Sequence, residues 1–340
     1  MILGQDGSVW STTFALGGMV IPSSSVRNRF VEVMSSGSGA TGVAAGKGFS
    51  IVLKQDGSVW VMGRNNRGQL GDVSYFTRQA LVFACVIAGA KAIDAGGHHS
   101  MILTDAGQIL ATGNNDYGQL GEGEMRAKSR FHEVMYSGAK AMSAGYLHSI
   151  VLKHDGSVWA TGRNQYGQLG DGSDTDCSSF VCVMSSGATD VVAGSHHSMV
   201  IKQDGSVWAT GWNEYGQLGD GTTTDQMGYL QVVLSGAKGI AAGSWHSIML
   251  KQDGSVWATG DNEYGQLGTR RIARSKVFVK VLSTGAKTIA AGSFHSMLIK
   301  QDGSTWGTGS NIHGQLGDGT VVNKDAFVKL APFSNGWYIS

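Results

Sequence analysis

Proline and cysteine are scarce in this chain, whose 340 residues include two prolines and three cysteines. The cysteines are Cys85, Cys177 and Cys182, an odd number at irregular spacing. This pattern predicts no disulfide framework and is typical of a reducing compartment. Because proline is nearly missing, turns must be made by glycine, and the chain has 52 glycines.

Long apolar runs and an excess of charge of one sign are lacking as well. A membrane-spanning helix needs about 18 or more consecutive apolar residues, and no such run is present. The first residues lack the basic and apolar regions of a signal peptide and enter a repeat at once. The formal net charge of +1 gives no general attraction for nucleic acid or anionic lipid. We therefore expect a soluble cytoplasmic or nuclear protein that binds neither membranes nor, directly, nucleic acid.

What the sequence does contain is a hexapeptide that recurs along its whole length. Its form is QDGSVW or a close variant, and a weaker copy, DAGQIL, occupies Asp105–Leu110. Repeats at a fixed period of this size indicate one repeat array. We expect residues 1–340 to form a single domain of seven repeats. The last residues of the seven copies stand at 10, 60, 110, 159, 208, 257 and 306, which are 49 or 50 apart.

One repeat predicts four short strands and no helix. Apolar residues alternate from Ala286 to Ala291, and His295–Lys300 and Ser304–Gly309 flank an Asp-Gly pair that is typical of a hairpin turn. A later apolar segment, Phe327–Leu330, supplies the fourth strand. No apolar stripe of period 3.6 has the length of a helix, so the pattern predicts an all-β protein.

Four-stranded sheets of this size must stack on neighbours to cover both faces. We therefore predict a seven-bladed β-propeller of four-stranded antiparallel blades, with the repeated tryptophans between the blades. An open solenoid is the alternative. The first residues, Met1-Ile-Leu, match Met297-Leu-Ile, and the last six residues match the segment just before it. The first blade should then be shared between residues 1–35 and a C-terminal strand at 333–340, which closes the ring.

Three motifs together resemble one known repeat family. They are Gly-Ser-x-His-Ser, Gln-Asp-Gly-Ser-Val-Trp and Gly-x-Asn-x-Tyr-Gly-Gln-Leu-Gly, and they resemble the regulator of chromosome condensation repeat across essentially the whole chain. The first unit departs, because residues 11–17 replace its loop. The resemblance implies a seven-bladed propeller closed by its termini. It leaves the function open, since members include a nucleotide exchange factor, a plant photoreceptor, ubiquitin-ligase modules and a bacterial enzyme inhibitor.

The repeated polar residues have structural explanations. A nucleophilic triad needs one Ser-His pair with an orienting acid and an oxyanion hole, whereas His-Ser recurs five times, from His99-Ser100 to His295-Ser296. One histidine per blade is too dispersed for a metal site. The repeated Asp of Asp-Gly fits turn chemistry. We therefore expect no catalytic residue, metal or cofactor.

Function is expected at positions that vary inside the constant repeat. Two such rings occur, one within Gly-x-Asn-x-Tyr and one at the x of Gly-Ser-x-His, and the connections that carry them should share one face of the propeller. Trp, Tyr and Arg are enriched there, as at binding hot spots. Packing of these aromatics between neighbouring loops is the alternative. The predicted partner-binding residues are Arg64, Arg67, Asp116, Tyr117, Arg163, Tyr166, Trp212, Glu214, Tyr215, Trp245, Asp261, Glu263, Tyr264 and Phe294.

These observations favour a monomeric, non-catalytic platform that binds another protein. The first alternative is a guanine nucleotide exchange factor for a Ran-like small GTPase, but the even repeat spacing leaves no room for the wedge such a factor uses. The second is an enzyme inhibitor of the β-lactamase-inhibitor type, which the missing signal peptide argues against. A basic segment, Arg270–Lys276, and several aspartates in the fourth and fifth units make the charge uneven, which predicts steering of a charged partner.

Overall fold

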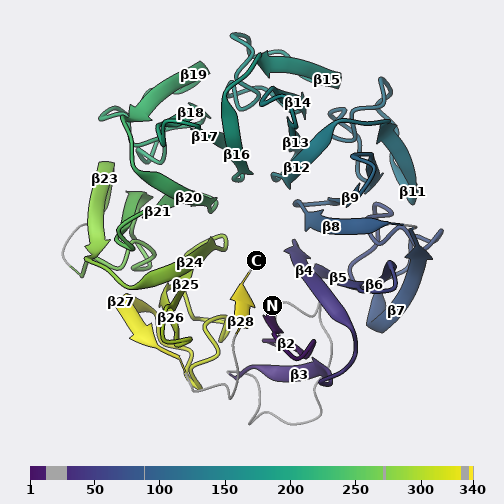
Figure 1. Cartoon of the computed structure of the whole chain (residues 1–340), viewed down its shortest axis with the longest axis horizontal. Coiled ribbons are helices and arrows are strands. Elements are labelled where there is room, and N and C mark those ends of the chain that lie inside the picture. The colour runs from purple at the N-terminus through teal and green to yellow at the C-terminus, as the bar shows by residue number, and fades with distance from the viewer. Residues whose placement is uncertain (13–28, 88, 271–272, 331–336, 340) are drawn as a thin grey trace.

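The computed structural model describes residues 1–12, 29–87, 89–270, 273–330 and 337–339. Within these ranges the chain forms 28 strands arranged as seven four-stranded antiparallel sheets around a central opening (Figure 1). The predicted all-β, seven-bladed propeller is confirmed. No helix in these ranges is long and apolar enough to cross a bilayer.

Each blade runs from an inner strand beside the central opening to an outer strand at the rim (Figure 1). The strands are, in blade 1, β28 (Trp337–Ile339), β1 (Ile2–Gly4), β2 (Val9–Ser11) and β3 (Val31–Met34); in blade 2, β4 (Ala40–Gly46), β5 (Phe49–Lys54), β6 (Ser58–Gly63) and β7 (Arg78–Val86); in blade 3, β8 (Ala90–Ala95), β9 (His99–Thr104), β10 (Ile109–Gly113) and β11 (Lys128–Met135); in blade 4, β12 (Ala139–Ala144), β13 (His148–Lys153), β14 (Val158–Gly162) and β15 (Cys177–Met184). They continue, in blade 5, with β16 (Ala188–Ala193), β17 (His197–Lys202), β18 (Val207–Gly211) and β19 (Gln226–Val233); in blade 6, with β20 (Ala237–Ala242), β21 (His246–Lys251), β22 (Val256–Asp261) and β23 (Arg274–Leu282); and in blade 7, with β24 (Ala286–Ala291), β25 (His295–Lys300), β26 (Thr305–Gly309) and β27 (Lys324–Lys329).

The ring is closed by its two termini. β28 pairs antiparallel with β1, and Leu3 lies opposite Tyr338. The predicted closure is therefore confirmed, although the strand itself covers only Trp337–Ile339 of the predicted 333–340; the remainder of that segment lies outside the described residues. The fourth strand of blade 7 differs slightly from the prediction, since it begins at Lys324 rather than Phe327.

The Asp-Gly turn and the tryptophan that follows it form one hydrogen-bonded unit. In blade 5, Asp204 Oδ1 accepts the Ser206 amide at 2.9 Å, and Ser206 Oγ accepts Trp208 Nε1–H at 3.0 Å. The ammonium group of Lys202 lies 4.0 Å from the centre of the Trp208 ring. The Ser206 hydrogen bonds lower the pKa of the Asp204 carboxyl below its ordinary value. The predicted turn role of this aspartate is confirmed.

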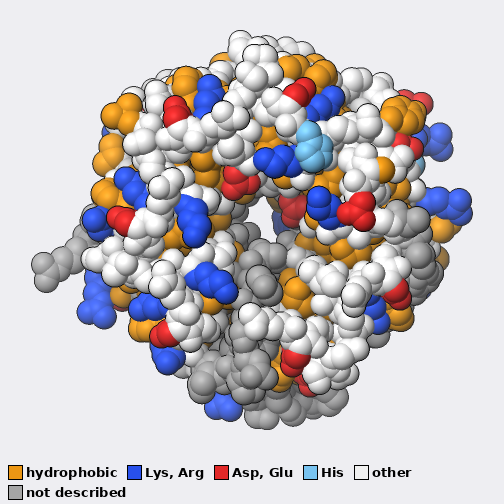
Figure 2. Space-filling view, viewed as in Figure 1, with side chains coloured by type: hydrophobic (Ala, Val, Ile, Leu, Met, Phe, Trp, Pro, Cys, Tyr) orange, Lys and Arg blue, Asp and Glu red, His pale blue; other side chains and the backbone are white. Residues whose placement is uncertain are grey.

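The same tryptophans fill the space between blades. Trp208 of blade 5 packs against a buried cluster that joins blades 4 and 5 and includes Ile150 and Val158. In blade 3 the tryptophan is replaced by Leu110, which packs on the equivalent cluster between blades 2 and 3. Burial of such large apolar surfaces is the main force that holds adjacent sheets together. The centre of the disc stays open, and Lys, Arg, Asp and Glu side chains are interspersed around one of its faces (Figure 2).

The repeated His-Ser pairs connect neighbouring blades. His197 Nε2 lies 2.8 Å from Ser247 Oγ of the next blade, and Ser247 Oγ donates its proton to the carbonyl oxygen of Gln217 at 2.8 Å. Since the hydroxyl has a single proton, His197 must donate from Nε2. The predicted structural role of the His-Ser pairs is confirmed. The same contact joins His99 to Ser149, His148 to Ser198 and His246 to Ser296.

Burial keeps these histidines neutral far into the acidic range. The pKa of His197 falls from 6.5 to about 3 because burial disfavours the imidazolium, and the nearby His196 lowers it further. The pKa values of His99 and His246 also fall to about 3 through burial. The unfolded chain takes up protons below pH 6.5, whereas the folded chain does not until pH approaches 3. Stability is therefore complete above pH 6.5 and is lost progressively as pH falls through this window.

We predict that His197→Gln makes the acid sensitivity of the protein shallower. Glutamine keeps an N–H donor for Ser247 but does not titrate. Between pH 6.5 and 5 the free energy of unfolding of the variant should therefore fall less steeply than that of the parent, with a difference between the two slopes of about 1.4 kcal/mol per pH unit. Urea unfolding followed by tryptophan fluorescence at several pH values measures this slope. His154→Gln, in an exposed hairpin, is the matched control. Equal slopes for His197→Gln and the parent would contradict the prediction.

We also predict that deleting residues 337–340 destabilises the whole ring. The deletion removes β28 and leaves β1 with an unpaired edge, so the free energy of unfolding should drop by about 3 kcal/mol, near 1 kcal/mol for each lost strand hydrogen bond. Thermal and urea unfolding of the two proteins measure the difference. An excess of a synthetic peptide spanning residues 333–340 should restore part of it. Unchanged stability would show that the terminal pairing does not support the ring.

Candidate interaction face

The two variable rings lie side by side on one face. In blade 5, the amide of Trp212 in the loop after β18 donates to the carbonyl of His196 in the turn after β16, at 2.8 Å. In blade 6, Asp261 donates to Trp245 in the same way, at 2.9 Å. The prediction that both rings share a face is confirmed. The equivalent bonds elsewhere join Arg64 to Gly48, Asn114 to His98, Arg163 to Leu147 and Ser310 to Phe294.

In the loop after β18, the side chains of two residues that recur in most repeats, Asn213 and Gln217, hold the backbone in place through hydrogen bonds. Asn213 Oδ1 accepts the Leu218 amide at 3.1 Å, and its Nδ2 donates to Asp220 at 3.0 Å. Gln217 Oε1 accepts the Tyr215 amide at 3.0 Å. These bonds satisfy buried polar groups beneath the surface. In blade 5 the loop backbone is therefore held by Asn213 and Gln217 rather than by the side chains of Trp212, Glu214 and Tyr215.

The variable aromatic side chains contact one another across several blades. The rings of Tyr215 and Trp245 stack with centroids 4.8 Å apart and an interplanar angle of 4°, and Trp245 packs edge-on against Phe294 at 4.8 Å. At the other end, Tyr146 lies 5.8 Å from His196. Such pairs are favourable beyond the area that they bury. We call this set the aromatic arc; it comprises His98, Tyr146, Tyr166, His196, Trp212, Tyr215, Trp245, Tyr264 and Phe294.

The predicted partner-binding residues fall into three groups by exposure, and their role in binding stays a prediction. Trp212 and Trp245 are partly buried within the arc, where their rings contact each other. The exposed residues are Arg64, Arg67, Asp116, Glu214 and Glu263; the partly buried ones are Tyr117, Arg163, Tyr166, Trp212, Tyr215, Trp245, Tyr264 and Phe294. Asp261 alone is buried.

Asp261 has a structural role. Its Oδ2 accepts Gln266 Nε2–H at 2.7 Å and lies 3.3 Å from the Glu263 amide, and only 4% of the residue is exposed. The equivalent positions in blades 3 and 7, Asn114 and Ser310, contact the corresponding glutamines. Asp261 is therefore removed from the face that a partner could reach.

Charged side chains surround the arc. Arg67 and Asp116 form an ion pair at 3.3 Å between blades 2 and 3, and both are about half exposed. Arg163 lies over Tyr117, with its guanidinium carbon 5.1 Å from the ring centre. From the predicted basic segment, Arg274 covers Tyr215 at 4.4 Å, while Arg271 lies outside the described residues.

The acidic residues of blades 4 and 5 are largely used within their own loops. Asp220 accepts Asn213 Nδ2–H, and Asp225 accepts the Asn213 amide at 2.8 Å. Asp171 accepts Asn164 Nδ2–H in the same way. Burial raises the pKa of the Asp225 carboxyl. These aspartates stabilise their own loops through hydrogen bonds, and their steering of a partner stays a prediction.

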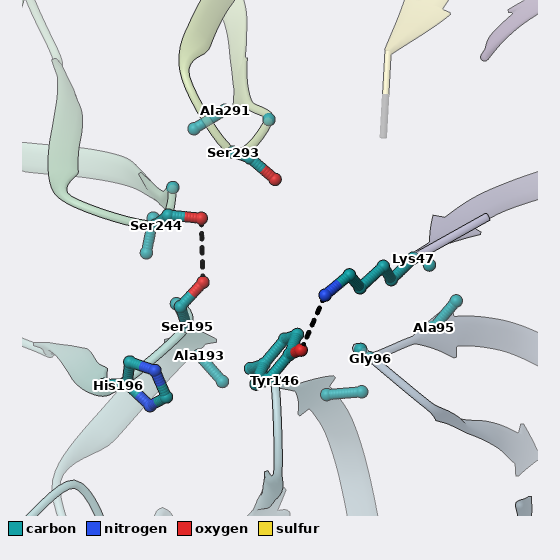
Figure 3. Close-up of a pocket in the computed structure, with 18 of the residues that line it drawn as sticks. Lys47, Ala95, Gly96, Tyr146, Ala193, Ser195, His196, Ser244, Ala291 and Ser293 are labelled. Carbon is teal, nitrogen blue, oxygen red and sulfur yellow. Dashed lines mark hydrogen bonds between the residues drawn. The ribbon is translucent and has the colours of Figure 1, made fainter. Parts of the chain in front are cut away.

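A funnel opens at the centre of this face. It encloses about 540 Å³ and is lined by the ends of the inner strands and the turns that follow them, among them Lys47, Tyr146, Ser195, His196 and Trp245 (Figure 3). Lys47 Nζ donates to Tyr146 OH at 2.9 Å, and Ser195 Oγ donates to Ser244 Oγ at 2.9 Å. Lys47 and Tyr146 are not among the residues predicted from the sequence. The available signal was their position, where blades 5, 6 and 7 have serine.

The funnel and the face around it offer binding chemistry. Trp, Tyr and Phe rings supply apolar surface, the lysine and arginines supply positive charge, and serine hydroxyls supply hydrogen bonds. Within the described ranges, no group of three or more His, Cys, Asp or Glu side chains is placed to hold a metal ion. The geometry therefore supports recognition of a ligand by shape and charge.

Solved structures with the same fold include three that the chain matches over most of its length. Human WBSCR16 is 22% identical, with a TM-score of 0.83 over 96% of this chain and 93% of that one. Yeast RCC1 (Prp20), in a complex with Kap60, is 19% identical, with a TM-score of 0.84 over 96% and 83%. A second structure, of Prp20p from Saccharomyces cerevisiae, is 20% identical, with a TM-score of 0.82 over 96% and 85%. These likenesses show the shared fold, and no curated protein sequence matches the chain.

Family models of the regulator of chromosome condensation (RCC1) repeat match the chain in most of its blades. One model matches residues 40–69, 90–119, 139–168, 188–217, 237–266 and 286–315, which together exceed half of the chain. A second model of the same repeat matches residues 155–201, 204–250 and 253–299. With the seven-bladed ring, the His-Ser contacts and the braced Gly-Gln-Leu-Gly loops described above, these matches place the chain in the regulator of chromosome condensation (RCC1) repeat family.

Proposed function

We propose that this protein is a non-catalytic platform that binds another protein through the face that carries the aromatic arc. The observation that carries the proposal is the continuous contact among large aromatic side chains at positions where other blades have small residues. The slot of Trp212 holds Ser310 in blade 7, and the slot of Trp245 holds Gly48 in blade 2. The scaffold therefore folds without these aromatics, and a binding role explains their presence.

The arc is suited to binding because its side chains are ordered before a partner arrives. Tyr215, Trp245 and Phe294 hold one another in place through ring contacts. Association then loses less side-chain entropy than it would with freely rotating residues. Exposed Glu214 and Glu263 beside the arc would form a polar rim, the usual surrounding of an apolar contact centre.

The related structures support a protein as the partner class. Prp20p has been studied with its binding to Gsp1p and histones, and yeast RCC1 (Prp20) has been solved with Kap60 bound. Each of these is a property of the yeast protein. For the present chain, a small GTPase is the specific alternative, and the aromatic face is the proposed contact in either case.

We predict that Trp245→Ala weakens partner binding about 30-fold, because loss of a central aromatic contact costs about 2 kcal/mol or more. Partners captured by crosslinking from the source organism would be identified, purified and titrated calorimetrically against both proteins. Tyr136→Ala is the matched control, since this tyrosine is 79% exposed and precedes β12, whose first amide contacts Gly107 in a hairpin of the opposite face. Thermal unfolding checks that each variant folds.

Unchanged affinity for Trp245→Ala, or an equal loss for Tyr136→Ala, would contradict the proposed face. A separate assay measures nucleotide release from a Ran-like small GTPase in the presence of the purified protein. Accelerated nucleotide release would contradict the platform proposal and support a role as an exchange factor. No acceleration, together with a loss of partner affinity in Trp245→Ala, is the expected pair of results.

A further inference from the structure

Three departures from the repeat meet at the mouth of the funnel. In blades 5, 6 and 7 the residue two positions before the second strand is serine, whereas blades 2, 3 and 4 have Lys47, Gly97 and Tyr146 at this point. Lys47 and Tyr146, from blades on either side of blade 3, approach each other and form the 2.9 Å hydrogen bond (Figure 3). The lysine nitrogen also lies 5.1 Å from the centre of the tyrosine ring.

Gly97, in the blade between them, makes this contact possible. A Cβ atom at Gly97 would lie 2.5 Å from Cδ2 and 2.6 Å from the carbonyl oxygen of Tyr146. The side chain that the repeat has here in other blades would therefore displace the tyrosine. Lysine, glycine and tyrosine thus act as one unit, and three other blades fold with serine instead. Because those blades fold with serine, the scaffold itself does not require Lys47, Gly97 and Tyr146 at these positions.

Positive charge without a carboxylate partner gathers around this unit. Across the part of the chain that the structure describes, the ion pairs involve Arg67 but none involves Lys47, Arg64 or Arg163. Burial lowers the pKa of His98, and the charges of Lys47 and Arg64 lower it further. Burial and then the charge of Arg163 lower the pKa of His196 to about 4. These histidines flank Tyr146, so the positive field covers both sides of the funnel mouth.

The opposite half of the face has another character. Blades 5, 6 and 7 contribute Trp212, Tyr215, Trp245 and Phe294 to the arc, and the exposed Glu214 and Glu263 stand beside them. The face is therefore uneven. Cations without a carboxylate partner gather at the funnel mouth over blades 2 to 4, whereas blades 5 to 7 present mainly apolar rings, with Arg274 over Tyr215. A ligand that matches it carries negative charge at one end and apolar side chains at the other.

We propose that the funnel binds an acidic peptide segment, with a carboxylate at Lys47 and Tyr146 and the following apolar side chains on the aromatic arc. This inference rests on the proposed function of the face and names the chemistry of its partner. Lys47 has donors left after its bond to Tyr146, and the funnel volume of about 540 Å³ accommodates an acidic side chain with its backbone. A nucleic acid fits less well, because its phosphates would lie against Glu214 and Glu263.

The test measures fluorescence anisotropy of labelled probes with the intact protein. The probe is a decapeptide with four consecutive glutamates followed by leucine and phenylalanine. Its controls are the same peptide with lysine in place of each glutamate and a ten-residue oligothymidylate. We expect binding of the acidic peptide that weakens as sodium chloride rises from 50 to 300 mM, and binding of neither control. Binding of the oligothymidylate in preference to the acidic peptide would overturn the proposal in favour of a nucleic-acid site.

Two variants locate the binding site. Lys47→Gln should weaken binding of the acidic peptide at least tenfold. Tyr146→Phe keeps the ring but removes the hydrogen bond, and it should weaken binding of the peptide about threefold. Lys238→Gln removes the same charge from an exposed position near the start of β20, on the opposite face, and should leave binding unchanged. Equal affinities of Lys47→Gln and the parent would overturn the proposal.

The outcome also separates this inference from the proposed function. If no acidic peptide binds while Trp245→Ala still releases the captured partner, the platform stands and the acidic-segment proposal fails. If the captured partner is insensitive to both Trp245→Ala and Lys47→Gln, the face itself is wrong. Loss of the partner in both variants, with competition by the acidic peptide, supports both.

Discussion

The contact on which the remaining structure depends is the hydrogen bond that the buried histidines of blades 3 to 6 donate to the serine of the next blade. His197 binds Ser247, and the Ser247 hydroxyl donates a hydrogen bond to the carbonyl of Gln217 at the base of the loop in the histidine's own blade. One chain of two bonds therefore joins a core strand, the neighbouring sheet and the loop that carries the variable residues. Because the imidazole is buried, protonation at low pH would place a charge in the core and destabilise this arrangement.

This arrangement separates the tasks of the sequence. The histidine, serine, asparagine and glutamine of each repeat satisfy buried polar groups and set the backbone, and the tryptophan fills the gap to the next blade. The positions between them vary without loss of the fold, although Asn114, Asp261 and Ser310 in one of these slots also bond the buried glutamine of their loops. Trp212 and Ser310 can therefore occupy equivalent slots in one ring, and Lys47, Gly97 and Tyr146 can replace serines without loss of the fold. The interaction face consists of residues at these variable positions.

Much of the fold could be predicted because its causes are local and repeated. The Asp-Gly turn, the inter-blade tryptophan and the matching of the two chain ends each follow from residues a few positions apart or from comparison of one repeat with another. The sharing of one face by both variable rings follows from antiparallel connectivity. Asp261 could not be placed in this way. Its slot holds exposed Arg64 in blade 2, and only the folded structure shows that the Asp261 side chain is buried and bonded to Gln266.

The sequence by itself determined the number of blades, the closure of the ring and the scaffold role of the histidines, because each is written into a periodic pattern that a single chain repeats. The tertiary structure alone decided which variable residues meet. Tyr215 and Trp245 come from different blades and stack at 4.8 Å, and Lys47 reaches Tyr146 across an intervening glycine. Such contacts depend on side-chain direction and on the curvature of the ring, and no periodicity along the chain records either of them.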